Sequence, residues 1–238
     1  MQFFDLHIHS AFSEGESSLE QLANMAKALS YKGICFSAYF QNDNQIKKLY
    51  EEIQKVKEKV KIEIFLGFEA RDEKELRKLI ERRKKFDVLL VHGGDLTLNR
   101  IACETPEVDI LTHPELNRID SGLNHIFVKE AAKNNVAIEI NFREILMANK
   151  KSRSKILKNI SNNIMLAKEF KAPLIICSGA VSHYELRDPE VLISLATQLG
   201  LDLSEAINSM SKIPEKILES TKERKDDKWI MPGVKLIK

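Results

Sequence analysis

Short apolar runs alternate with amphipathic stretches along most of the chain. The runs are rich in Ile and Val and lie at residues 3–8, 33–37, 60–68, 88–91, 108–111, 136–140 and 173–177. Bare apolar runs of this length are typical of parallel strands that are covered on both faces. Because the stretches between them have helical periodicity, the pattern predicts repeated βαβ units, with seven strands each followed by a helix.

The stretch at 19–29 shows the helical pattern clearly. Leu19, Leu22 and Ala26 share one face, and Ser18 is expected to cap the helix, with Gln21 at the spacing of a capping box. Comparable helices are predicted at 43–59, 73–85, 122–134 and 152–170, and two or three more after residue 180. No linker or change in composition divides the 238 residues, so closure into one α/β barrel is favoured over two domains.

Composition excludes several classes of protein. Three widely spaced cysteines form no CxxC pair, the first residues do not resemble a signal peptide, and no apolar run approaches the roughly 18 residues of a membrane span. We therefore expect a cytoplasmic protein with no membrane partner. The net charge of +2 is too small to indicate a nucleic-acid binder, but residues 143–171 hold eight Lys and Arg against two Glu. Such a run is either a solvated helix face or a surface that binds phosphates.

Polar residues follow the ends of the predicted strands. His7 and His9 end the first run, Glu69 the third, His92 the fourth and His113 the fifth. In a βα barrel these ends meet at one rim, where functional groups lie. Two imidazoles two residues apart on a strand face the same side, and nitrogen and carboxylate ligands suit zinc or manganese. The alternative is a polar barrel mouth whose histidines are satisfied by hydrogen bonds.

Residues 5–10 (DLHIHS) resemble the opening motif of the polymerase-and-histidinol-phosphatase (PHP) superfamily of metal-dependent phosphoesterases. The likeness extends to GFE at 67–69, VH at 91–92, THP at 112–114 and IEIN at 138–141. Two of the superfamily's motifs are broken, because SAY at 37–39 and SGAV at 178–181 replace a Thr-Asp-His type sequence and Ser-Asp-Ala-His. Ala38, Tyr39, Gly179 and Val181 thus stand where the resemblance implies ligands or catalytic groups. A hydrolase with three metal ions needs nearly all its ligands, so we do not expect the isolated chain to be catalytic.

A longer resemblance covers about residues 1–215. The blocks VHGGDL at 91–96, NR at 99–100 and CETPEVDILTHP at 103–114 resemble the archaeal ribonuclease P protein component 3 family, the thirty-kilodalton subunit family. This resemblance implies a PHP-like distorted TIM barrel, with about seven parallel strands and extra C-terminal helices, over residues 1–220, followed by a basic tail at 221–238. It also implies a subunit of the RNA–protein endonuclease that removes the 5′ leader from precursor tRNA.

The resemblance further implies partners and cofactors. The partners would be ribonuclease P RNA, precursor tRNA and the other protein subunits, especially a small RRM-like α/β subunit. The RNA would carry the catalytic site and use Mg²⁺, so this chain requires no cofactor, although its remaining His and Glu residues allow one Zn²⁺ or Mn²⁺ ion. The other hypotheses are a free-standing PHP phosphoesterase and a catalytically silent barrel used only for assembly.

RNA binding is expected to be electrostatic, because aromatic residues are scarce and form no stacking motif. Arginine and lysine beyond or near the strand ends are the candidates, since a guanidinium can donate two parallel hydrogen bonds to a phosphate. Arg100 is the first choice, although it could instead pair with Glu104 four residues on. The full predicted set is Arg71, Arg100, Arg118, Lys133, Arg143, Lys150, Lys151, Arg153 and Lys158.

Overall fold

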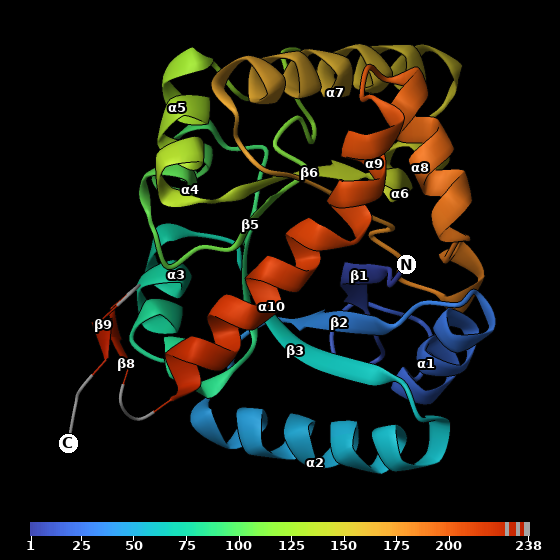
Figure 1. The fold of residues 1–238 in the computed structure, drawn as a ribbon, viewed down its shortest axis with the longest axis vertical. Helices are drawn as coiled ribbons and strands as arrows, with labels where there is room; N and C mark the ends of the chain where they lie inside the picture. The colour runs from blue at the N-terminus through green and yellow to red at the C-terminus, as the bar shows by residue number, and fades with distance from the viewer. Residues whose placement is uncertain (227–228, 232–233, 236–238) are drawn as a thin grey trace.

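Seven parallel strands form a barrel surrounded by helices in the computed structural model, which describes residues 1–226, 229–231 and 234–235 (Figure 1). The strands are hydrogen-bonded in chain order, and every predicted apolar run overlaps one of them. Their bounds are β1 Phe4–His9, β2 Gly33–Ala38, β3 Glu63–Ala70, β4 Val88–His92, β5 Ile110–Thr112, β6 Ala137–Asn141 and β7 Leu174–Cys177. The predicted α/β barrel is therefore confirmed.

The first and last strands meet and close the barrel almost completely. Ile8 forms an isolated parallel bridge with Ala180, just beyond β7. Ala180 O accepts a hydrogen bond from His9 N at 2.7 Å, and His7 O accepts one from Gly179 N at 3.0 Å. The segment that closes the barrel is thus the one that carries a broken PHP motif.

Helices cover the outside of the barrel. Ser18 caps the first of them in a complete capping box with Gln21, as predicted. The short helices α4 and α6 were not predicted individually, and the stretch predicted at 73–85 divides into α3 and a short 3-10 helix at Arg83–Lys85. The α-helices are α1 Leu19–Ala28, α2 Asp43–Val60, α3 Glu73–Ile80, α4 Leu96–Glu104, α5 His125–Asn134, α6 Phe142–Met147, α7 Lys150–Phe170, α8 Pro189–Gln198, α9 Leu203–Met210 and α10 Lys212–Lys225.

A bulge in β1 decides which of its side chains face the barrel interior. Between Asp5 and Ile8 this strand advances three residues while β2 advances two, from Ile34 to Phe36. Because side chains alternate along a strand, one extra residue reverses the alternation. Leu6 therefore packs inside the barrel below the bulge, whereas Ile8 packs outside against the helices above it. The bulge turns His7 and His9 inward.

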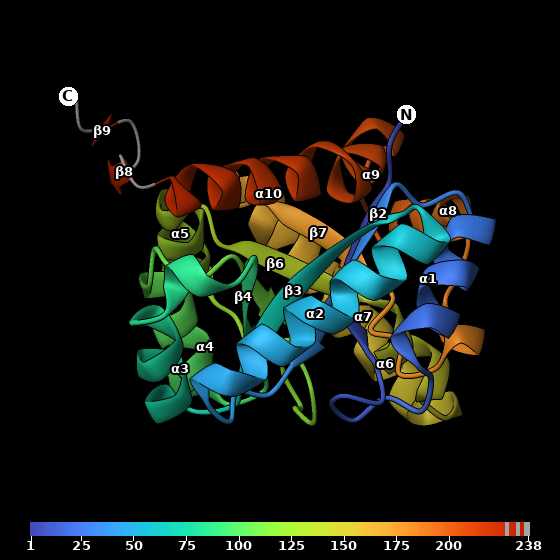
Figure 2. The same ribbon diagram turned by 90° about the horizontal axis from the view of Figure 1, so that it is seen from below.

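Helix α10 covers the end of the barrel where the strands begin (Figure 2). Its Ile217 and Leu218 join the interior cluster formed by β-strand residues such as Leu6 and Leu90. Polar contacts hold the last turns of the helix in place. Arg224 Nη2 donates to Asp109 Oδ1 at 2.7 Å, and the buried guanidinium of Arg83 pairs with the other carboxylate oxygen of Asp109. The interior is thus closed at this end by apolar and ionic contacts.

The predicted domain boundary at residue 220 falls inside α10. The hydroxyl of Thr221 donates to Asp87 O at 2.6 Å, and Lys225 Nζ contacts Asp87 Oδ1 at 2.6 Å. The first residues of the predicted basic tail are therefore anchors of the barrel. Beyond them, Trp229–Met231 and Val234–Lys235 form two short antiparallel strands, β8 and β9. Tail residues 227–228, 232–233 and 236–238 lie outside the described residues.

No helix of the described part of the chain is both long and apolar enough to cross a membrane.

Replacing Asp109 by Ala should destabilise the fold strongly. The substitution leaves Arg83 and Arg224, which are 6% and 13% exposed, without their shared carboxylate. Breaking a buried ion pair from one side costs about 3–5 kcal/mol of unfolding free energy, which denaturant titration would measure. Lys222→Ala, an exposed change on the same helix, serves as the control. A loss no larger than that of this control would show that the ionic contacts do not hold α10.

Candidate functional site

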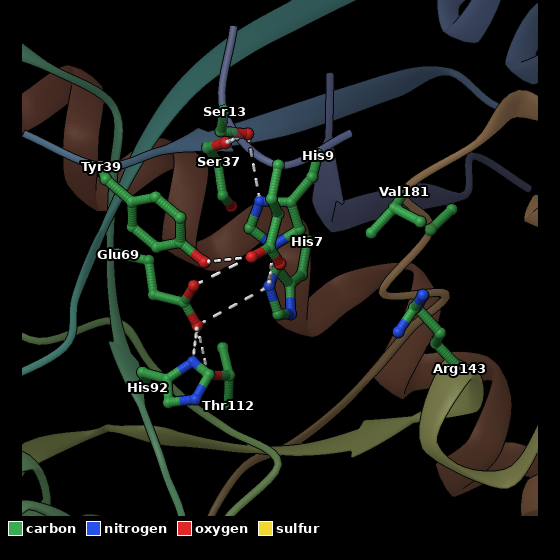
Figure 3. Close-up of polar contacts among 12 residues, drawn as sticks. His7, His9, Ser13, Ser37, Tyr39, Glu69, His92, Thr112, Arg143 and Val181 are labelled. Atoms are coloured by element: carbon green, nitrogen blue, oxygen red, sulfur yellow. Dashed lines mark hydrogen bonds and ion pairs between the residues drawn. The ribbon is translucent and has the colours of Figure 1, made fainter. Parts of the chain in front are cut away.

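The five residues predicted as metal ligands gather at the other end of the barrel, where the strands finish. Figure 3 shows His7, His9, Glu69 and His92 converging. The first two come from β1, Glu69 from β3, His92 from β4, and His113 follows β5. The side chain of His92 is 35% exposed, whereas the other four are buried. The mouth therefore presents one accessible imidazole above a closed cluster.

Glu69 lies at the centre of this cluster. Its Oε1 is 3.4 Å from His92 Nδ1 and 3.8 Å from the Nε2 atoms of both His7 and His113. The Thr112 hydroxyl donates to the same oxygen at 2.8 Å. Burial favours the neutral acid, but the close contact with His92 and the other surrounding imidazoles lower the pKa of Glu69 well below its usual range. Glu69 is therefore an ionised carboxylate without direct access to solvent.

Glu139 is a second buried carboxylate, and it is not among the predicted site residues. His7 Nδ1 donates to its Oε1 at 2.7 Å, and its Oε2 accepts from His113 N at 2.9 Å and Asn141 Nδ2 at 3.1 Å. The alternation of side chains along the predicted strand could have identified it, since Glu139 lies between Ala137 and Asn141 on the inward side. An acid on that side below the rim must have polar partners.

The two carboxylates determine the protonation of the histidines. Although burial opposes it, Glu139 and Glu69 raise the pKa of His7 to about 9. Burial and the nearby positive charge of His7 lower the pKa of His9 to about 4. The Nε2 atoms of the two rings are 3.0 Å apart, so a protonated His7 donates to both Glu139 and His9. One proton on His7 thus links Glu139 and His9 through hydrogen bonds.

The same atoms also fit a metal ion. Ligand atoms of His7, His9 and Glu69 all lie within 4.8 Å of one another, as do those of Glu69, His92 and His113. His113 Nδ1 is buried without a hydrogen-bond partner in the described structure. When His7 is neutral, its Nδ1–H still binds Glu139 and its Nε2 lone pair faces the cluster, which is how a carboxylate orients a metal-binding histidine. The donor set suits Zn²⁺ or Mn²⁺.

The positions where the PHP resemblance implies further groups are filled differently. Ala38 is buried at the end of β2. Tyr39 donates to Glu14 Oε2 at 2.9 Å, and Oε1 of that glutamate is 3.6 Å from His9 Nε2. Gly179 has φ +62°, and a Cβ atom there would lie 2.6 Å from the amide of Asn141. A side chain cannot replace this glycine unless Asn141 moves.

Val181 likewise occupies its position with an apolar, buried side chain, and Figure 3 shows it on the far side of the mouth from Glu69. The mouth is therefore one-sided, with ligands on β1, β3, β4 and after β5 and none at the ends of β2 and β7.

Three of the predicted RNA-binding residues form surface ion pairs on or near helices. Arg71 binds Glu75 through Nε and Nη2 at 3.2 and 2.7 Å, and its guanidinium lies over the ring of Tyr39. Arg100 Nε contacts Glu104 at 2.7 Å and Lys133 Nζ contacts Glu130 at 3.1 Å. The alternative ion pair between Arg100 and Glu104 does form, but the arginine side chain remains 61% exposed.

Three other arginines of the set stabilise loops and helix ends. Arg118 Nη1 donates to Gly94 O at 2.9 Å, and Arg143 Nε contacts Glu185 at 3.0 Å. Arg153 donates to Ile145 O at 3.0 Å and to Ala148 O at 2.8 Å, so it caps the C-terminal end of α6. These guanidinium groups are partly used for holding the structure together.

The remaining members of the set are Lys150, Lys151 and Lys158, in the N-terminal half of α7. All three are exposed. Among the residues that the structure describes, none of them has an ion pair or a side-chain hydrogen bond. The predicted set therefore does not form one uniform patch, because the other six members have ion pairs or side-chain hydrogen bonds and these three lysines do not.

The fold and the mouth together define a class: a TIM-like α/β barrel with a partial histidine–carboxylate cluster at the carboxyl ends of its strands. The model of the family described as RNase P subunit p30 matches residues 2–226 of the chain. The chain belongs to this family.

Relatives and a solved structure agree with that assignment. The chain is 34% identical to ribonuclease P protein component 3 of Methanosarcina mazei, with 99% of this chain and 96% of the relative covered. It is 35% identical to component 3 of Methanothermobacter thermautotrophicus, covering 100% and 96%. A chain in a cryo-EM structure of archaeal ribonuclease P with mature tRNA superposes with a TM-score of 0.82 and 30% identity, covering 98% of both chains.

We expect the metal-free chain to take up about one Zn²⁺ or Mn²⁺ ion, because Glu69 is shared by both ligand groups. Equilibrium dialysis followed by elemental analysis would measure the uptake. His7→Ala removes a ligand of one group and His113→Ala a ligand of the other, so comparing the two variants identifies the group that binds. His125→Ala, a change on the surface of α5, is the control. Absence of metal after dialysis would favour the hydrogen-bonded cluster with its proton on His7.

Proposed function

We propose that this chain works as a protein subunit of ribonuclease P, the endonuclease that removes the 5′ leader from precursor tRNA. The observation that carries the proposal is the match to a chain of archaeal ribonuclease P over 98% of both chains at a TM-score of 0.82. The family model over residues 2–226 supports the same role. In this role the chain binds RNA and other protein subunits, and a small RRM-like α/β subunit is the partner that the family resemblance implies.

The mouth supports a non-catalytic role for the isolated chain. Ala38 and Val181 offer no ligand atoms, Gly179 lies against Asn141, and the hydroxyl of Tyr39 is bound to Glu14. Hydrolysis by several metal ions requires them to activate a nucleophile and to hold both reacting oxygens. Too few ligands remain for that mechanism, so the free-standing phosphoesterase is not favoured. In this role cleavage is carried out by the assembled enzyme, in which the RNA and its Mg²⁺ ions supply the chemistry. The expected location of the chain is the cytoplasm.

RNA binding distinguishes this proposal from a barrel that serves assembly alone. The described structure leaves several cations exposed on α4, α5 and α7, including Arg100, Lys133 and Lys151. Salt lowers the affinity of exposed cations for phosphates, because binding releases counterions from the RNA. A subunit that only holds other proteins together would show no such salt dependence with RNA.

Adding the chain to the other components of the enzyme should raise the cleavage of precursor tRNA. The measurement is the rate of 5′-leader release by ribonuclease P RNA and the remaining subunits, with and without this chain. The variant His113→Ala, which lacks one candidate metal ligand, should still stimulate cleavage, because the mouth of the barrel has no catalytic step in this role.

An unchanged cleavage rate when the chain is omitted would contradict the subunit role. So would rapid hydrolysis of a generic phosphodiester by the isolated chain with Mn²⁺, if His7→Ala and His9→Ala abolish it.

Arg100→Ala should lower reconstituted cleavage while the fold stays intact. The prediction rests on a guanidinium that is 61% exposed and bound to Glu104 through Nε. Loss of one phosphate contact should also reduce the slope of log affinity against log salt by about one unit. Glu104→Gln is the matched control, because it weakens the ion pair and keeps the guanidinium. Cleavage at saturating protein that is unchanged in Arg100→Ala, with a small fall in Tm, would assign Arg100 to the structural pair alone.

A further inference from the structure

The outer face of α7 carries lysines at helical spacing. Lys151, Lys155 and Lys158 are four and three residues apart, so they lie on one face of the helix over about 10 Å of its length. All three are exposed, and none has an ion pair or a side-chain hydrogen bond with another described residue. We refer to these three residues as the α7 lysine face.

No acidic side chain compensates this charge within the first turns of the helix. The sequence of α7 contains a single acid, Glu169, close to its C-terminal end. Lys151, in the first turn, is opposed by the helix dipole, and the like charges of Lys151 and Lys155, four residues apart, repel each other. The α7 lysine face therefore weakens the isolated helix, and an anion bound there would relieve both effects.

Contacts on the buried side of α7, which adjoins the lysine face, hold the helix firmly. Asn159 and Asn163 are buried and donate to the backbone of the 113–124 loop, at Asp120 O (2.7 Å) and Ser121 O (3.0 Å). Arg153 binds the carbonyls at the end of α6, which fixes the first turns. Since these contacts fix the backbone of α7, the lysines project from a firmly held helix.

The helix also places these lysines close to the mouth end of the barrel. Helix α6 begins directly after β6, and α7 begins three residues after α6 ends, so its N-terminal half lies toward the carboxyl ends of the strands. Helix α10 lies across the other end (Figure 2). The α7 lysine face is therefore well separated from the α10 surface, which offers an internal comparison.

We propose that the α7 lysine face is a docking surface for the phosphate backbone of RNA. This inference rests on the proposed role as a ribonuclease P subunit and specifies which surface contacts RNA. It adds Lys155 to the predicted set and removes Arg118 and Arg153, whose guanidinium groups bind backbone carbonyls. Three ammonium groups in line suit successive phosphates of one strand, and such contact reads charge and shape rather than base sequence.

The test compares two triple variants of the full-length chain. One carries Lys151→Ala, Lys155→Ala and Lys158→Ala. The control carries Lys212→Ala, Lys216→Ala and Lys222→Ala, which removes three exposed lysines from α10 and changes the net charge equally. Binding of ribonuclease P RNA is followed by fluorescence anisotropy over a range of salt concentrations, and thermal unfolding confirms that both variants fold.

We expect the α7 variant to bind RNA about tenfold more weakly or worse, with a salt slope shallower by about two to three units, one contact for each lysine lost. The α10 control should bind like the unsubstituted chain. A third variant with arginine at the three α7 positions should restore most of the affinity, because it restores the charge.

Three results would overturn the proposal. In the first, the α7 variant binds RNA like the unsubstituted chain, while that chain still stimulates cleavage; the subunit role then stands and the surface is wrong. In the second, the α7 and α10 variants weaken binding equally, so net charge alone acts. In the third, the α7 variant keeps its RNA affinity but loses a partner subunit, which makes the face a protein interface. If the unsubstituted chain neither binds RNA nor stimulates cleavage, the proposed function fails as well.

Discussion

Closure of the barrel between β1 and the chain after β7 is the constraint on which the mouth depends. The hydrogen bonds from His9 N to Ala180 O and from Gly179 N to His7 O join the two ends of the sheet at the level of the histidines. The β1 bulge lies just below these bonds and turns His7 and His9 inward. At the other side of the joint, Gly179 must remain free of a side chain because Asn141 lies beneath it. Geometry that closes the barrel therefore also brings the imidazoles together and leaves no room for a ligand at residue 179.

Charge balance is the second requirement at the mouth. Glu69 and Glu139 are buried carboxylates, and a buried charge is costly unless it is paired. Four imidazoles surround them, of which His7 has the highest pKa, about 9, because it lies next to both acids. A proton on His7 balances one of the two negative charges, and a divalent cation among the histidines would balance both. A cluster of this kind needs no catalytic role to persist, since Thr112 donates to Glu69 and hydrogen bonds reach both oxygens of Glu139.

The sequence predicted the fold more completely than the site. Seven apolar runs and the helical periods between them are repeated signals, and each run corresponds to one strand of the barrel. The positions of polar residues at the strand ends likewise predicted five members of the cluster at the mouth: His7, His9, Glu69, His92 and His113. The pattern of apolar and polar residues does not predict which residues distant in the chain contact each other. Glu139 is buried among partners from β1 and the end of β5, and Arg224 reaches an aspartate 115 residues away.

The difference between arginine and lysine explains why all five arginines of the predicted set have protein partners, whereas three of its four lysines have none among the described residues. A guanidinium has five donors in a planar fork and is weakly hydrated, so a folded chain readily uses it to bind carboxylates and carbonyls. All five arginines of the predicted set do so, including Arg100. An ammonium group is strongly hydrated and sits on a flexible stem, so it stays in water unless a strong anion displaces that water. In this barrel the five arginines are held by partners on the protein surface. Lys151, Lys155 and Lys158 in the N-terminal half of α7 leave their charge available to a partner.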